Sequence, residues 1–145
     1  MATRSQAARR RFLLHPPFVA MGGTLLIAAF FTDYNYLSSS LFQWANFSAW
    51  LITAGLVLAL ISAIFLFIDL LIGGAGRIRW VDFAILALAV ILSIFNALVH
   101  SRDAWTSVVP DGIALSAITA ILLLVAAFRG WTVTGDHLPA DGGAA

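Results

Sequence analysis

Four long apolar stretches divide the chain, and most of the charged side chains lie in the segments between them or in the segments before the first and after the last. The first contains no Asp, Glu, Lys or Arg from Phe12 to Thr32. At about 1.5 Å of rise per residue, roughly 20 apolar residues cover the roughly 30 Å hydrocarbon core of a bilayer. Comparable stretches follow over about 48–72, 81–99 and 112–128. The pattern predicts four membrane-spanning helices.

The residues between these stretches indicate where the helices begin and end. Pro16 and Pro17 suit the first turn of a helix, where a missing N–H costs nothing. Residues 34–47 are aromatic and polar but uncharged, which predicts a loop along the membrane surface. Residues 73–76 are rich in Gly and end the second span, and Asp111 is placed to cap the fourth. We expect an all-α integral membrane bundle of four antiparallel helices.

The distribution of Arg predicts the orientation of this bundle. Seven of the eight Arg residues fall on one side of the expected membrane and only Arg102 falls on the other. The positive-inside rule then places both termini in the cytoplasm. Residues 1–11 become a basic cytoplasmic tail, 12–131 the transmembrane domain and 132–145 a flexible cytoplasmic tail. The seven are Arg4, Arg9, Arg10, Arg11, Arg77, Arg79 and Arg129.

Composition supports the membrane assignment and excludes several kinds of site. Of the 145 residues 61% are hydrophobic and 10% are charged, against about a quarter charged in a typical soluble domain. The absence of Cys excludes disulfides, thiolate catalysis and iron–sulfur ligation. A net charge of +1 gives no reason to expect a nucleic-acid partner. The lipid bilayer is the expected partner.

A first cluster of polar residues is expected on the cytoplasmic side, where His15 begins one helix and Asp69 ends the next. Ionisable groups at membrane depth usually face a partner or a water-filled cavity. Two interpretations stay open. His15 and Asp69 form a proton-accepting or ligand-binding pair, or Asp69 makes an interfacial ion pair with Arg77 or Arg79. The second is favoured, because Asp69 lies close to the end of its span.

A second cluster, formed by Asp33, His100 and Arg102, is expected at the outer mouth of the bundle. It is interpreted either as a gate or anion site, or as a structural ion pair beside a histidine at the water interface. The structural interpretation is favoured, with Asp33 bound to Arg102, because few other charges are available on that side. His100 is the competing partner for Asp33.

The sequence offers little basis for a cofactor or an enzyme. A b-type haem held by two histidines needs both imidazoles at one depth. His15 and His100 fall on opposite sides of the membrane and His137 lies in the tail, so bis-histidine haem is disfavoured. The nucleophile-elbow, zinc-protease, P-loop and dinucleotide-binding motifs do not occur. We expect no bound metal, no cofactor and no catalytic residues.

The order of these features resembles a family of bacterial membrane proteins known as domain of unknown function 2231. The resemblance extends from about His15 to Asp136 and implies the same four-helix membrane fold, in the inner membrane of a bacterium. In place of a second histidine near the start of the third helix, this chain has Trp80, Val81 and Asp82, which argues against a role that needs two histidines on the cytoplasmic side. The matching features are His15-Pro16, Asp33 with Tyr36, the small and aromatic residues leading to Asp69, Arg102, Gly130-Trp131 and Gly135-Asp136.

Two functions are consistent with the sequence. The favoured one is a structural or accessory subunit beside a redox or transport partner, since no charge lies in the middle of any span. The alternative is a small transporter or channel that works as a homo-oligomer, and a membrane cytochrome is a lesser possibility. Small residues in the first two helices, among them Gly22, Gly23 and Gly55, also predict close packing between these helices.

Overall fold

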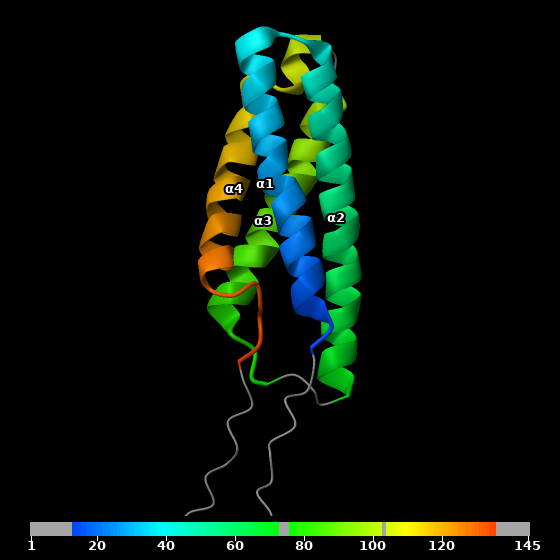
Figure 1. Ribbon diagram of the computed structural model, residues 1–145, viewed down its shortest axis with the longest axis vertical. Coiled ribbons are helices and arrows are strands. Elements are labelled where there is room, and N and C mark those ends of the chain that lie inside the picture. The colour runs from blue at the N-terminus through cyan, green and yellow to red at the C-terminus, as the bar shows by residue number, and fades with distance from the viewer. Residues whose placement is uncertain (1–12, 73–75, 103, 136–145) are drawn as a thin grey trace, which may run out of the picture.

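The structure is a computed structural model that describes residues 13–72, 76–102 and 104–135. Four long helices run side by side along one axis (Figure 1). All four are long and apolar enough to cross a membrane, as the sequence predicts. They are α1 (His15–Ser39), α2 (Phe42–Leu71), α3 (Trp80–His100) and α4 (Asp111–Phe128), and a short 3-10 helix, η1 (Ala104–Ser107), precedes α4.

Consecutive helices run in opposite directions and enclose a common core. α1 packs most extensively against α2, while the contact between α2 and α3 is the least extensive of those around the bundle. The described chain starts and finishes at the same end of the bundle, which we call the terminal end (Figure 1). The α1–α2 turn lies at the opposite end, which we call the hairpin end.

The region between the first two spans is helical and does not form the surface loop predicted for residues 34–47. Only Ser40 and Leu41 separate α1 from α2. The side chains of Asn35 and Ser39 donate to backbone carbonyl oxygens one turn earlier, each at 2.7 Å. Polar side chains that bond in this way are compatible with a helix, so polarity alone did not identify a loop. The chain reverses at Ser40, whose φ is 55°.

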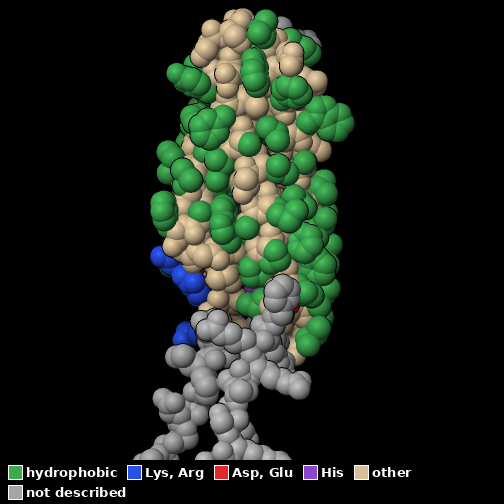
Figure 2. Space-filling model, in the orientation of Figure 1, with side chains coloured by type: hydrophobic (Ala, Val, Ile, Leu, Met, Phe, Trp, Pro, Cys, Tyr) green, Lys and Arg blue, Asp and Glu red, His purple; other side chains and the backbone are tan. Residues whose placement is uncertain are grey.

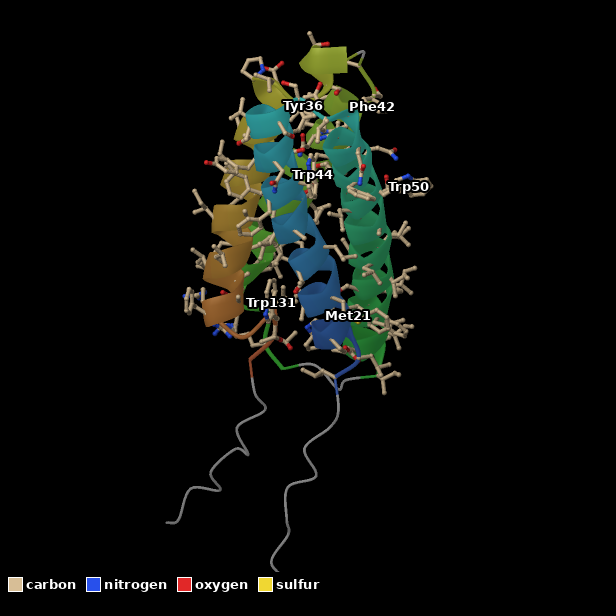
Figure 3. All side chains as sticks on the ribbon, turned by 45° about the horizontal axis from the view of Figure 1, so that its top comes forward. Met21, Tyr36, Phe42, Trp44, Trp50 and Trp131 are labelled. Atoms are coloured by element: carbon tan, nitrogen blue, oxygen red, sulfur yellow. The ribbon has the colours of Figure 1, made fainter. Side chains whose placement is uncertain are left out.

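The close packing predicted between the first two helices is confirmed at Gly22 and Gly55. A Cβ on Gly22 would lie 3.1 Å from the carbonyl oxygen of Gly55, and one on Gly55 would lie 2.7 Å from the Leu26 side chain. Gly23 faces another partner, because a Cβ there would overlap the indole ring of Trp131. Trp131 accordingly lies between the helices, whereas Trp50 projects outward (Figure 3).

The centre of the bundle is an apolar layer to which every long helix contributes. Its buried side chains are Leu26 and Ala29 of α1, Ile52 of α2, Ala89 of α3 and Leu123 of α4. Large hydrophobic side chains also cover the outer surface (Figure 2). A surface of this kind suits hydrocarbon surroundings, where an exposed apolar side chain carries no penalty.

The Gly22–Gly55 contact predicts the effect of a larger side chain. Gly55→Leu should lower the melting temperature in detergent, because the added atoms would meet Leu26 and the α1 backbone, and overpacking costs about 1 to 3 kcal/mol. Ala54→Leu is the matched control, because Ala54 is the exposed neighbour on the same helix. Equal melting temperatures for the two variants would contradict the packing of α1 on α2.

Candidate functional site

The N-terminus of α1 is capped by a carboxylate from α2. The α1 N-cap residue, Leu14, provides no side-chain hydrogen bond, and Pro16 has no N–H. Asp69 Oδ2 accepts the backbone N–H groups of Leu14 at 3.0 Å and His15 at 3.1 Å. Asp69 therefore does for α1 what an N-cap side chain does within a helix, and its charge lies at the positive end of the α1 dipole.

The same carboxylate holds the imidazole of His15. His15 Nδ1 lies 2.8 Å from Asp69 Oδ2, with His15 0% and Asp69 5% exposed. Because this carboxylate acts as acceptor for two backbone N–H groups, the proton in its bond with His15 belongs on Nδ1. The ring orientation is thereby fixed and its Nε2 faces away from Asp69. Ser62 of α2 also donates to the His15 carbonyl oxygen, at 3.3 Å.

A segment after α4 supplies the neighbour of His15 Nε2. Gly130 and Trp131 both have positive φ, 94° and 57°, and turn the chain back beneath the bundle. Thr132 Oγ1 then lies 3.3 Å from His15 Nε2. Residues 132–135, which were predicted to belong to a flexible tail, bond to the segment before α3. For instance, the backbone N–H of Arg79 donates to the Val133 carbonyl oxygen at 2.8 Å.

A second buried carboxylate at the terminal end, that of Asp82, was not predicted from the sequence as part of a polar cluster. Asp82, near the start of α3, is 3% exposed and pairs with Arg79 at 2.6 Å and with Arg129 after α4. The hydrogen bond and the negative charge of Asp82 raise the pKa of Arg129 above its usual value. The sequence feature that could have identified the pair with Arg79 is an Asp in the first turn of an apolar helix, three residues after an Arg.

At the terminal end the structure brings His15 and Asp69 together, as the less favoured interpretation proposed. The ion pair expected between Asp69 and either Arg77 or Arg79 is wrong. Arg79 binds Asp82, and Arg77 contributes its carbonyl oxygen to the N–H of Gly135. Asp69 bonds instead to the N-terminus of the neighbouring helix, which the sequence alone does not place beside it.

A second buried His–Asp pair lies at the hairpin end. His100 Nε2 is 2.9 Å from Asp33 Oδ1, with the side chains 2% and 0% exposed. His100 Nδ1 lies 3.0 Å from the backbone carbonyl oxygen of Asn96. Because this oxygen can only accept a hydrogen bond, Nδ1 carries a proton. One further proton is then shared between Nε2 and Oδ1. The pair as a whole is neutral, which lowers the cost of burying it.

The predicted bond between Asp33 and Arg102 is wrong. Arg102 binds Asp111 at 2.8 Å, and both side chains are more than half exposed. The reason is the length of α1, which continues six residues beyond Asp33 to Ser39 and so places Asp33 inside the bundle. Asp111 was expected to cap α4, but the N-cap residue is Pro110 and Asp111 lies within the first turn.

Several buried side-chain oxygen atoms have no hydrogen-bond partner in the described part of the chain. They include Asp33 Oδ2 of the second pair, Asn96 Oδ1 one turn before His100, and Thr119 Oγ1 in the middle of α4. The α4 backbone approaches this region closely, because a Cβ on Gly112 would lie 3.1 Å from the His100 ring and 3.4 Å from Asn96 Oδ1. Buried oxygens of this kind ordinarily bind water or another donor.

The two histidines that the structure describes do not lie at one depth in the bundle. His15 lies at the terminal end and His100 at the hairpin end, with the apolar central layer between them. His137 lies outside the described residues. Among the residues that the structure does describe, no three His, Cys, Asp or Glu side chains form a group suited to a metal ion.

The chain matches a known family. A family model described as "Predicted membrane protein (DUF2231)" matches residues 11–138, which is most of the chain. The match confirms the resemblance seen in the sequence. No curated protein and no solved structure matches the chain.

The cap formed by Asp69 predicts a large cost for its removal. Asp69→Ala would leave His15 Nδ1 and two backbone N–H groups without an acceptor, and breaking a buried pair of this kind costs about 3 to 5 kcal/mol. Asp111→Ala is the control, because its exposed pair with Arg102 is worth about 0 to 1 kcal/mol. Denaturation in detergent measures both, and similar losses would contradict the buried cap.

A double-mutant cycle tests the pairing at the hairpin end. Asp33→Ala and His100→Ala should each destabilise the protein, and the double variant should lose less than the sum, because no buried partner remains alone. Asp33→Ala combined with Arg102→Ala should be additive, since Arg102 binds Asp111. Coupling of Asp33 to Arg102, without coupling to His100, would restore the pairing predicted from the sequence.

Proposed function

We propose that this chain, which belongs to the DUF2231 family of predicted membrane proteins, is a non-catalytic accessory subunit beside a redox or transport partner. The observation that carries the proposal is the separation of its buried polar groups. One His–Asp pair lies at each end of the bundle, and the layer containing Leu26, Ile52 and Leu123 lies between them.

This arrangement argues against a path for ions through one copy of the chain. Charged or polar groups and water must follow one another across the bilayer to conduct an ion or a proton. The central layer of the described bundle instead consists of apolar side chains.

The His–Asp pairs themselves support a structural role. His15, Asp33 and the His100 side chain are at most 2% exposed, and each imidazole already has partners for both ring nitrogens. A catalytic histidine needs access to a substrate atom within hydrogen-bond reach. In the absence of a hydrophobic drive between helices in lipid, such buried polar pairs hold the bundle together.

We also propose that the terminal end lies in the cytoplasm of a bacterial cell. Arg77, Arg79 and Arg129 are at this end, whereas Arg102 is at the hairpin end. Cytoplasmic segments carry an excess of Arg and Lys, which favours this orientation.

A transporter or channel that works as an oligomer is the second candidate. The observation in its favour is the set of unpaired oxygens on Asp33, Asn96 and Thr119, which extends from the hairpin end along α3 and α4. Such groups would hold water, and water would bring protons into this half of the bundle.

Two measurements separate these candidates. Purification in mild detergent should yield a complex whose mass requires a second protein in a fixed ratio, and an absorption spectrum would report a redox group in that partner. Proteoliposomes containing the chain alone should show no proton or cation flux above that of empty liposomes. Flux that is lost in Asp33→Asn and kept in the exposed control Asp111→Asn would overturn the accessory role and favour the transporter.

A further inference from the structure

A cavity of about 520 Å³ lies in the terminal half of the bundle, against all four helices. Its walls include Gly22 of α1, Ala63 of α2, Leu86 of α3 and Leu123 of α4. It opens where α2 and α3 pack least extensively. Leu60 of α2 is one lining residue that reaches the outer surface, at 64% exposed. We call this space the α2–α3 cleft.

The α2–α3 cleft opens toward the hydrocarbon region and not toward water. Its lining side chains are nearly all apolar, and the flanking surfaces of α2 and α3 are covered by exposed hydrophobic residues such as Val57 and Leu88. Both helices are long and apolar enough to cross a bilayer. A molecule that enters the cleft therefore arrives from the membrane.

The polar residues in the lining are His15 and Ser62, and both lie toward the terminal end. No Asp or Arg belongs to the lining in the described part of the chain, although Arg79 and Arg129 lie at the same end. A charged head group would therefore be desolvated in the cleft without a charged partner, which is costly. The lining favours a ligand with one small, uncharged polar head and an apolar tail.

We propose that the α2–α3 cleft binds an isoprenoid quinone. The volume lies in the range of about 300 to 1,000 Å³ that holds a ligand of drug-like size, which suits one ring and part of its tail and is small for a phospholipid with two acyl chains. A quinone head is uncharged, and the rest of its tail extends between α2 and α3 into the bilayer.

Ser62 supplies the hydrogen bond that orients the quinone ring. Ser62 lines the cleft, and its hydroxyl donates to the backbone carbonyl oxygen of His15 over 3.3 Å, at the long end of the normal range. A quinone carbonyl oxygen at this position accepts the same proton. Asp69 meanwhile holds the His15 ring in place, so the polar end of the cleft is already formed before the ligand arrives.

The proposal does not depend on an accessory role, because the whole cleft belongs to one copy of the chain. The experiment uses the purified full-length chain in phosphatidylcholine nanodiscs, with a quinone that carries a short isoprenoid tail. Quinone retained after gel filtration is measured by absorption and corrected with empty nanodiscs. Wild type should bind it saturably, at one quinone per chain.

Substitutions in the α2 and α3 walls of the cleft test whether the quinone binds there. Ala63→Phe on α2 and Ala87→Phe on α3 should each weaken binding about tenfold or more, because a phenyl ring would fill the cleft. Ala54→Phe and Ala84→Phe are the matched controls, because both residues are exposed on the same helices and neither lines the cleft. Ser62→Ala should weaken binding less than either wall variant. Melting temperatures identify any variant that does not fold. If one wall variant does not fold, the variant on the other wall provides the test.

Three outcomes would overturn the proposal. The first is retention of quinone no greater than in empty nanodiscs. The second is equal binding by the wall variants and their controls. The third is displacement of the quinone by phosphatidylglycerol as readily as by unlabelled quinone, which would make the occupant an ordinary anionic lipid. A failed search for a partner protein would leave all three measurements unaffected.

Discussion

The bundle depends on the placement of the Asp69 carboxylate at the N-terminus of α1. A buried carboxylate is costly unless hydrogen bonds and positive charge compensate it, and here two backbone N–H groups, the helix dipole and the His15 imidazole do so together. The same bonds fix the position of α1 relative to α2. They also fix the ring that Thr132 contacts from the segment after α4.

Polar contacts of this kind connect all four helices. His15–Asp69 joins α1 to α2, Asp33–His100 joins α1 to α3, and Asp82 joins α3 to the residue that follows α4. Close approach at Gly22 and Gly55 adds van der Waals contact between the two most extensively packed helices. In a soluble protein, burial of apolar surface determines much of how helices pack. In lipid, apolar side chains are also stable on the outer surface, so these polar and close-packing contacts have to determine much of the helix arrangement.

The sequence predicts the spans well and their polar contacts poorly, for a physical reason. Apolar length is a local property, so four helices follow from the composition of each stretch. The partner of Asp33 depends on where α1 ends, and side chains that bond to their own helix let α1 continue past a polar segment to Ser39. The contact between Asp82 and Arg129 likewise has no signal in the sequence, because it joins positions far apart in the chain. No local sequence pattern predicts the α2–α3 cleft, because the cleft depends on how the four helices pack against one another.

The unequal lengths of the helices have a consequence for the surrounding membrane. At about 1.5 Å per residue, the 30 residues of α2 extend over roughly 45 Å, whereas the 18 residues of α4 extend over roughly 27 Å. One side of the protein thus matches a thin bilayer and the other side a thick one. Lipids must thin beside α4, or the whole bundle must tilt so that α2 crosses obliquely. If the bundle stands upright, the bilayer beside α4 is thinner than the bilayer beside α2, and such a difference favours the border between thin and thick regions of a membrane.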